Sequence, residues 1–261
     1  MSKIYHKSNY QWHTLFSIAF LLLLASCAKD VKKEEMPLSE LSEKALAALE
    51  NKKRDVAIEY LEQIIYRFPD HQHIAQYKIL LAEQYFKKDR YAEAQELYDH
   101  YSQFYPSDTR AEYAKYKSIL AMYHQTLRHD CDQTETEKTI LLCHEYLQNL
   151  TYAKYQKDVF DIQNTCENKL IDKEVYVFNF YLKRGEIAAS RNRLTYLKEK
   201  FSEKHPELSP RLLYLECKLA KHEKNDTIVT QNLSVLKQKY PASQYTNMAK
   251  GLAEHKDYFF F

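Results

Sequence analysis

Glycine is nearly absent from this sequence, which contains only Gly185 and Gly251 in 261 residues, against an average usage of about 7%. A loop that cradles phosphate needs several residues that adopt positive φ and let the ligand approach the backbone. The sequence therefore excludes the glycine-rich nucleotide loops of Rossmann and P-loop proteins. It also disfavours sheets built on tight glycine turns.

The sequence also lacks an apolar run long enough to cross a membrane. The longest run, residues 15–24, holds ten mostly apolar residues, whereas a membrane-spanning helix needs about 20. Two lysines precede this run and two small residues, Ala25 and Ser26, follow it. This is the order of a secretory signal peptide. We therefore expect residues 1–26 to be removed from the mature protein.

Neither sign of charge is in excess. The chain carries 38 Lys and Arg against 36 Asp and Glu, and Lys3 and Lys7 lie in the predicted leader, so the mature chain is formally neutral. A neutral chain has no overall field with which to gather phosphates. Nucleic acid is therefore not an expected partner.

Residues 24–27, with the sequence LASC, resemble the lipobox of bacterial lipoproteins. The resemblance implies that Cys27 is lipidated after cleavage of the leader, because two or three acyl chains hold a protein stably on a bilayer. The alternative is a plain secreted protein that begins with Cys. Ala28 stands where an Asp commonly retains lipoproteins at the inner membrane, so the resemblance implies the periplasmic face of the outer membrane.

Beyond Leu38 the sequence repeats itself. Each unit has a polar turn, a helix with a small residue on its inner face and, in most units, a closing aromatic-Pro pair. The units that show the pattern are residues 51–70, 86–108, 183–202 and 224–243. The closing prolines Pro69 and Pro106 are 37 residues apart, and a period in the thirties indicates an array of helix pairs.

This pattern resembles the tetratricopeptide repeat. Small residues such as Ala94 let two antiparallel helices approach each other, and aromatic residues such as Tyr98 fill the space between successive pairs. We expect an all-α tetratricopeptide-repeat solenoid of about five helix-turn-helix repeats over residues 38–255, with the third repeat degenerate. Residues 27–37 then form a lipidated tether, and residues 256–261 form a C-terminal tail.

One segment gathers residue types that bind metals. Its members are His124, His129, Asp130, Cys131, Asp132, Cys143 and His144. Their spacing fits no closed zinc pattern, since the segment has no Cys-x₂-Cys pair. We favour a solvated loop between repeats and predict neither a metal site nor a cofactor.

Besides Cys27 the chain has four cysteines, Cys131, Cys143, Cys166 and Cys217. The periplasm permits disulfides, so Cys143 has possible partners in Cys131 and Cys166. Free thiols also pack readily in protein cores. The sequence leaves both alternatives open.

No arrangement of catalytic residues stands out. The acidic residues fall on helix faces with Lys or Arg three or four positions away, as Glu199 and Glu203 do beside Lys200 and Lys204. Such charges are typical of solvated helix faces with modest ion-pair support. We therefore predict that the protein is not an enzyme.

Tyrosine is abundant, with 23 residues, and most of them are expected to pack between helices. Stacked helix pairs also form a groove in which an exposed tyrosine anchors a peptide at low entropic cost. The candidates are Tyr60, Tyr77, Tyr85 and Tyr91. Of these, Tyr85 is taken as a candidate partner-binding residue, with core packing as the alternative.

A lipobox followed by about five such repeats resembles the BamD family of outer-membrane β-barrel assembly lipoproteins. The most specific match is the segment 175–201, "VYVFNFYLKRGEIAASRNRLTYLKEKF". Within it Arg184 and Gly185 form the family's turn, and Arg193 follows two small residues. The segment departs from the pattern at its end, because the expected Tyr-Pro is missing and the proline is displaced to Pro206.

The resemblance implies a scaffold that takes part in the folding and insertion of outer-membrane proteins. Its C-terminal repeats would dock onto periplasmic domains of a BamA-like barrel-forming subunit, and its N-terminal repeats would face unfolded outer-membrane proteins. Arg184 and Arg193 are the partner-binding residues that it implies, and an exposed helix face is expected for Arg193. A scaffold for cell-wall or division proteins would share the anchor and the repeats, and is the alternative.

Overall fold

The computed structural model describes residues 36–254. The predicted leader, Cys27 and the predicted tail lie outside this range. Within it, helices alone make up the regular structure. They are α2 Leu38–Glu50, α3 Arg54–Arg67, α4 Ile74–Lys87, α5 Tyr91–Phe104, α6 Ala111–His124, α7 Thr134–Gln148, α8 Gln156–Lys183, α9 Ile187–Phe201, η2 Pro206–Leu208, α10 Ser209–His222, α11 Asp226–Lys239 and α12 Gln244–Glu254.

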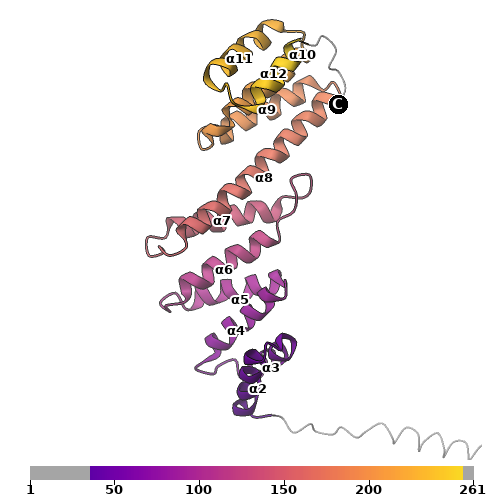
Figure 1. Ribbon diagram of the computed structural model, residues 1–261. Coiled ribbons are helices and arrows are strands. Elements are labelled where there is room, and N and C mark those ends of the chain that lie inside the picture. The colour runs from indigo at the N-terminus through magenta and orange to yellow at the C-terminus, as the bar shows by residue number, and fades with distance from the viewer. Residues whose placement is uncertain (1–35, 255–261) are drawn as a thin grey trace, which may run out of the picture.

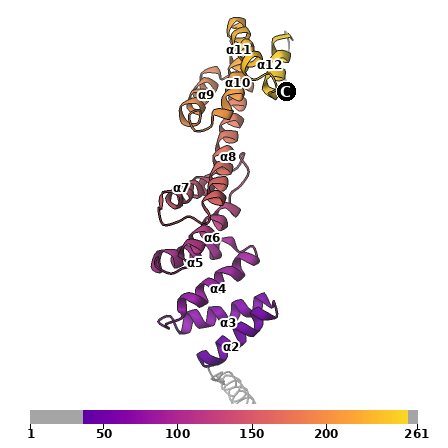
Figure 2. The same cartoon turned by 60° about the vertical axis from the view of Figure 1, so that its left-hand side comes forward.

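The helices stack in sequence order as an elongated array, with α2 at one end and α12 at the other (Figures 1 and 2). Five successive pairs form the repeats: α2 with α3, α4 with α5, α6 with α7, α8 with α9, and α10 with α11. Helix α12 packs against both helices of the fifth repeat. The predicted all-α solenoid of about five helix pairs is confirmed.

Small residues lie where the two helices of a repeat meet. Ala57, Ala94 and Ser190 each occupy the fourth position of the second helix, and all three are fully buried. The Ser190 hydroxyl also donates a hydrogen bond to the Phe178 carbonyl at 3.2 Å. A larger side chain at these positions would force the helices apart.

Three repeats end in the same way. Phe68, Tyr105 and Tyr240 each follow the second helix of a repeat and precede a proline, with φ of −128°, −126° and −134° and ψ of 53°, 54° and 50°. The residue before proline avoids the helical region, so each pair stops its helix. In the fourth repeat His205 takes this role before Pro206, with φ −122° and ψ 70°.

Four of the five repeats share one turn between their helices. A single residue in each turn has positive φ, and the N–H groups there and at the next residue bond to carbonyls of the preceding helix, which is the Schellman arrangement. The positive-φ residues are Lys52 (55°), Asp89 (58°), Gly185 (74°) and Lys224 (57°). The third repeat has the longer connection 125–133 instead.

Helix α8 joins the two halves of the solenoid (Figure 2). It has 28 residues, whereas the other α-helices from α2 to α12 have 11 to 15. Val159 and Ile162 in its first half pack in a cluster with α6 and α7, and Leu170 and Phe178 in its second half pack with α9 and α10. The departure from the repeat motif in the middle of the sequence is therefore a helix shared by two cores.

The connection from α7 to α8 is fixed by a side chain instead of an aromatic-Pro pair. Glu112 Oε1, from α6, accepts hydrogen bonds from the Tyr146 hydroxyl at 2.6 Å and from the N–H groups of Ala153 at 2.8 Å and Lys154 at 2.6 Å. One carboxylate thus holds the loop that the degenerate third repeat leaves without its usual close.

Within residues 36–254, no helix combines the length and the apolar character needed to cross a membrane.

Candidate partner-binding surfaces

An aromatic ridge runs along the second half of α8. Tyr176 and Phe180 are four residues apart, one helical turn, and they are 51% and 47% exposed. They lie on the side of α8 opposite its buried residues Val175, Phe178 and Leu182. Exposed aromatic residues in such a row make this face of α8 a candidate docking surface.

Arg184 extends this ridge toward the turn of the fourth repeat. Its guanidinium carbon lies 5.4 Å from the centre of the Phe180 ring, and its Nε bonds to Glu186 Oε1 at 3.0 Å. The side chain keeps 61% of its surface exposed. An arginine held over an aromatic ring is positioned without being enclosed, so it is available to a partner.

Arg193, on α9, contacts a different side of α8 from the ridge. Its Nη1 is 3.3 Å from Oε2 of Glu174, a mostly buried carboxylate on α8. Glu174 and Phe180 are six residues apart and so about 120° apart around the helix. The Arg193 side chain keeps 42% of its surface exposed on α9, and its contact with Glu174 joins α9 to α8. The structure does not bring Arg184 and Arg193 together.

Tyr85 is part of the core of the first two repeats. It is 7% exposed, its hydroxyl donates a hydrogen bond to Glu62, and the Arg90 guanidinium carbon lies 4.1 Å from its ring centre. Burial, together with the bond to Glu62, raises the pKa of its hydroxyl. Tyr85 therefore has almost no surface for a partner to contact. Its position is that of a core residue, which was the alternative prediction.

The histidines and cysteines of residues 124–144 are dispersed. His124 stacks on Tyr91 with ring centres 4.5 Å apart, His129 lies 6.0 Å from the Tyr176 ring, and His144 bonds to Gln148. Across the described part of the chain, no three His, Cys, Asp or Glu residues gather as metal ligands.

The four cysteines of residues 36–254 are free thiols. Cys131 is exposed, whereas Cys143, Cys166 and Cys217 are buried. Burial raises the pKa of Cys143 to about 12 and those of Cys166 and Cys217 to about 11. A thiol with such a pKa holds almost no thiolate at neutral pH, so the three buried side chains act as small apolar residues.

The comparisons with known proteins agree with this architecture. A family model described as YfiO, outer membrane lipoprotein, matches residues 34–224, which is well over half of the chain. The chain belongs to this family. The match begins just before α2 and extends to Lys224 in the turn of the fifth repeat.

Three curated relatives of this YfiO-family chain carry the name outer membrane protein assembly factor BamD. The protein of Caulobacter vibrioides is 24% identical over 192 residues, that of Pasteurella multocida 25% over 193, and that of Neisseria meningitidis 23% over 196. The matches cover 70%, 70% and 69% of this chain. They span 63%, 74% and 73% of the relatives' own lengths.

The sequence contained a signal for the ridge that composition alone does not show. Tyr176, Phe180 and Arg184 recur at intervals of four, which places them on one helix face. The apolar residues of α8 follow their own stripe on the other face. Two stripes on one helix indicate two contacts, one internal and one left for a partner.

Proposed function

We propose that this YfiO-family protein is a lipid-anchored scaffold on the periplasmic face of the outer membrane. It takes part in the folding and insertion of outer-membrane β-barrel proteins through protein-protein binding, without catalysis. The observation that carries this proposal is the family match over residues 34–224, together with the assembly-factor name of all three relatives.

The aromatic ridge of α8 supports a docking role for the C-terminal repeats. Tyr and Arg, the types of Tyr176 and Arg184, are enriched among the residues that carry most of the binding energy in protein interfaces, and Phe, the type of Phe180, is enriched at interfaces. We assign this ridge to the periplasmic domains of a BamA-like barrel-forming subunit. The N-terminal repeats are then free to face unfolded outer-membrane proteins.

Arg193 has a supporting part in this proposal. Its contact with Glu174 ties α9 to the side of α8, and the ridge lies on another side of the same helix. Arg193 therefore orients the ridge, while Arg184 contacts the partner.

Purification from detergent-extracted outer membranes tests the proposal. The lipidated protein should co-purify with a large β-barrel protein that has periplasmic domains. The double substitution Tyr176→Ala and Phe180→Ala should lose this partner while its helical circular dichroism stays unchanged. Phe160→Ala is the matched control, because Phe160 lies on the first half of α8 and is 52% exposed.

Two results would contradict the proposal. Recovery of cell-wall or division proteins without a barrel protein would support the alternative scaffold. Equal loss of the barrel protein in the ridge variant and in the Phe160→Ala control would remove the ridge from the docking surface.

A further inference from the structure

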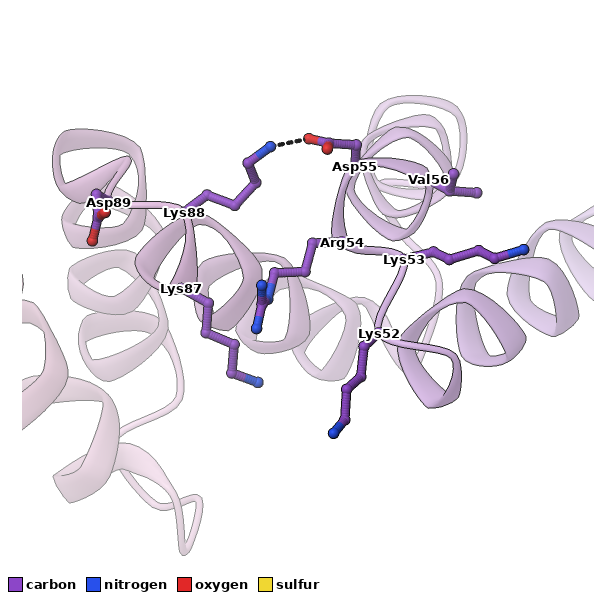
Figure 3. Close-up of a pocket in the computed structure, with 8 residues that line it drawn as sticks. All are labelled: Lys52, Lys53, Arg54, Asp55, Val56, Lys87, Lys88 and Asp89. Atoms are coloured by element: carbon purple, nitrogen blue, oxygen red, sulfur yellow. Dashed lines mark hydrogen bonds and ion pairs between the residues drawn. The ribbon is translucent and has the colours of Figure 1, made fainter.

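A basic cavity opens at the first two repeats. Its volume is about 520 Å³ (Figure 3). One side is formed by the α2–α3 turn and the start of α3, and the other by the end of α4 and the turn that follows it. Five basic and two acidic side chains line it with one valine: Lys52, Lys53, Arg54, Asp55, Val56, Lys87, Lys88 and Asp89.

The acids of this cavity are already engaged. Asp55 pairs with Lys88, and Asp89 accepts a hydrogen bond from the Tyr91 hydroxyl at 2.6 Å. The other four cations have no side-chain partner among the described residues: Lys52, Lys53, Arg54 and Lys87. Figure 3 shows the side chains of Lys52, Arg54 and Lys87 extending into the same open space. The cavity therefore has an excess of positive charge, which Glu83, beside Lys52, Arg54 and Lys87, offsets only in part.

The backbone adds to this charge. The N-terminus of α3 faces the cavity, and its N-cap residue Lys53 provides no side-chain acceptor. The N–H groups of Asp55 and Val56 have no acceptor in the described part of the chain. Free N–H groups at a helix start, together with the helix dipole, favour an anion.

The corresponding turns at the other end of the solenoid have more of their charge paired. In the fourth repeat Arg184 pairs with Glu186 at 3.0 Å. In the fifth repeat Lys221 pairs with Asp226 at 3.1 Å, and the Asn225 side chain caps α11 by accepting from the Ile228 N–H at 3.3 Å. Within residues 36–254, Lys183 and Lys224 remain without an ion pair at these two turns, one in each, whereas the N-terminal cavity gathers four such cations.

We propose that this cavity binds the phosphate groups of anionic lipid headgroups, which places the first repeat against the membrane surface. The proposal rests on the lipid anchor of the proposed function. The chain between Cys27 and Leu38 spans at most about 40 Å, and α2 is about 20 Å long, so the cavity lies within reach of the anchored surface. Lysine and arginine beside anionic lipid are attracted to it, and the formally neutral mature chain provides no competing overall field.

A tryptophan reporter makes the contact measurable in the lipidated protein. The only tryptophan, Trp12, lies in the predicted leader, so the mature chain is a blank background. Val56→Trp puts a reporter at the cavity. Ile228→Trp is the matched control, since Val56 and Ile228 are the third residues of α3 and α11 and are 40% and 37% exposed.

The protein is reconstituted in vesicles of phosphatidylcholine alone or mixed with phosphatidylglycerol, with a quencher attached at headgroup depth. We expect quenching of the tryptophan at position 56 only when phosphatidylglycerol is present, and its loss at high salt. The tryptophan at position 228 should respond in neither vesicle. Inorganic phosphate added to phosphatidylcholine vesicles should leave both reporters unchanged.

Charge-reversal variants are the second part of the test. Lys52→Glu with Lys87→Glu should abolish the phosphatidylglycerol-dependent quenching. Lys183→Glu with Lys224→Glu makes the same charge change at equivalent turn positions of the fourth and fifth repeats, and should leave the quenching intact. Vesicle flotation is measured in parallel, because loss of flotation reports failure of the lipid anchor and not of the cavity.

The proposal is overturned if the anchored protein floats while the tryptophan at position 56 ignores phosphatidylglycerol. It is also overturned if both reporters respond equally. If quenching is absent while the Lys52→Glu and Lys87→Glu variant loses a co-purifying protein, an acidic protein segment occupies the cavity instead.

Discussion

At the scale of single residues, the turns between paired helices contain backbone strain that cannot be predicted from the sequence. Lys52, Asp89 and Lys224 take the same positive φ as Gly185, although a side chain in this region is disfavoured by about 1–2 kcal/mol. The same two bonds to the preceding helix fix the turn whether or not it has a glycine.

Replacing Lys224 by glycine should therefore stabilise the protein, because it relieves the strain without removing a paired charge. We expect the free energy of unfolding to rise by about 1 kcal/mol in urea denaturation. Gly185→Ala should lower it by a similar amount, and only through the backbone, since a Cβ at Gly185 would meet no atom within 4 Å. If Lys237→Gly, inside α11, stabilises as much as Lys224→Gly, the strain explanation is wrong.

The family resemblance singled out Arg193 but did not predict its ion pair with Glu174. Arg193→Glu should place two carboxylates against each other at Glu174, which is mostly buried. We expect a loss of about 1–3 kcal/mol in the free energy of unfolding, at the low end if solvent screens the half-exposed arginine. Lys237→Glu, on the exposed face of α11, serves as the control and should be nearly neutral. A wild-type denaturation curve for Arg193→Glu would mean that the contact with Glu174 stabilises nothing.

At the scale of the helices and their connections, the repeats that keep their motif are the ones that the sequence predicts. Small residues such as Ala94 and closing pairs such as Tyr105-Pro106 report local packing and backbone geometry, so their meaning does not depend on distant residues. The two exceptions depend on contacts across long stretches of sequence. Glu112 fixes a loop about 40 residues away, and His205 bonds to Glu167 at 2.7 Å across 38 residues. Such long-range contacts cannot be predicted from local patterns in a single sequence.

The same reasoning explains why the sequence placed Arg184 at the turn but did not settle whether Tyr85 is buried. The motif placed Arg184 correctly at the turn, because the turn is local. It gave no information on Tyr85, because nothing in a tyrosine's spacing separates a core position from an exposed one. The bond from Tyr85 to Glu62 on the neighbouring repeat decides the matter.

Glu112→Gln tests the loop contact of the third repeat. Burial alone would raise the pKa of Glu112, but the hydrogen bonds from Tyr146, Lys154 and Ala153 outweigh it and lower the pKa below its usual 4.5. A lowered folded-state pKa contributes stability that is fully present above the unfolded pKa and is lost as the pH falls through the folded value. We expect Glu112→Gln to cost about 1–3 kcal/mol at neutral pH, and the difference from wild type to shrink in acid.

Thermal unfolding between neutral pH and about pH 3 measures this difference. Glu137→Gln, on the exposed face of α7, is the control and should change little at any pH. A Glu112→Gln deficit that stays constant down to the lowest pH would show that the charge of Glu112 is not what holds the loop.

At the scale of the whole molecule, two halves meet at one shared helix. The first half has the basic cavity, in the two repeats that follow the predicted tether in the sequence, and the second half has the aromatic ridge on α8. Their separation along an elongated solenoid suits a protein that holds a membrane surface and a protein partner at the same time (Figure 1).

Cys27→Ser tests the anchor, because Cys27 is the residue that the lipobox resemblance gives for lipidation. We expect the substitution to abolish labelling by a fatty-acid analogue and to reduce the protein in outer-membrane fractions. Undiminished labelling of the Cys27→Ser chain would remove the lipid anchor from the proposed function.

The most direct measurement of the central proposal is the abundance of β-barrel proteins in the outer membrane after depletion of this protein. Quantitative mass spectrometry of membrane fractions should show a broad fall in barrel proteins, reversed by the lipidated wild-type chain and not by the Tyr176→Ala and Phe180→Ala variant. Unchanged barrel proteins, with a defect confined to the cell wall or to division, would contradict the proposed function.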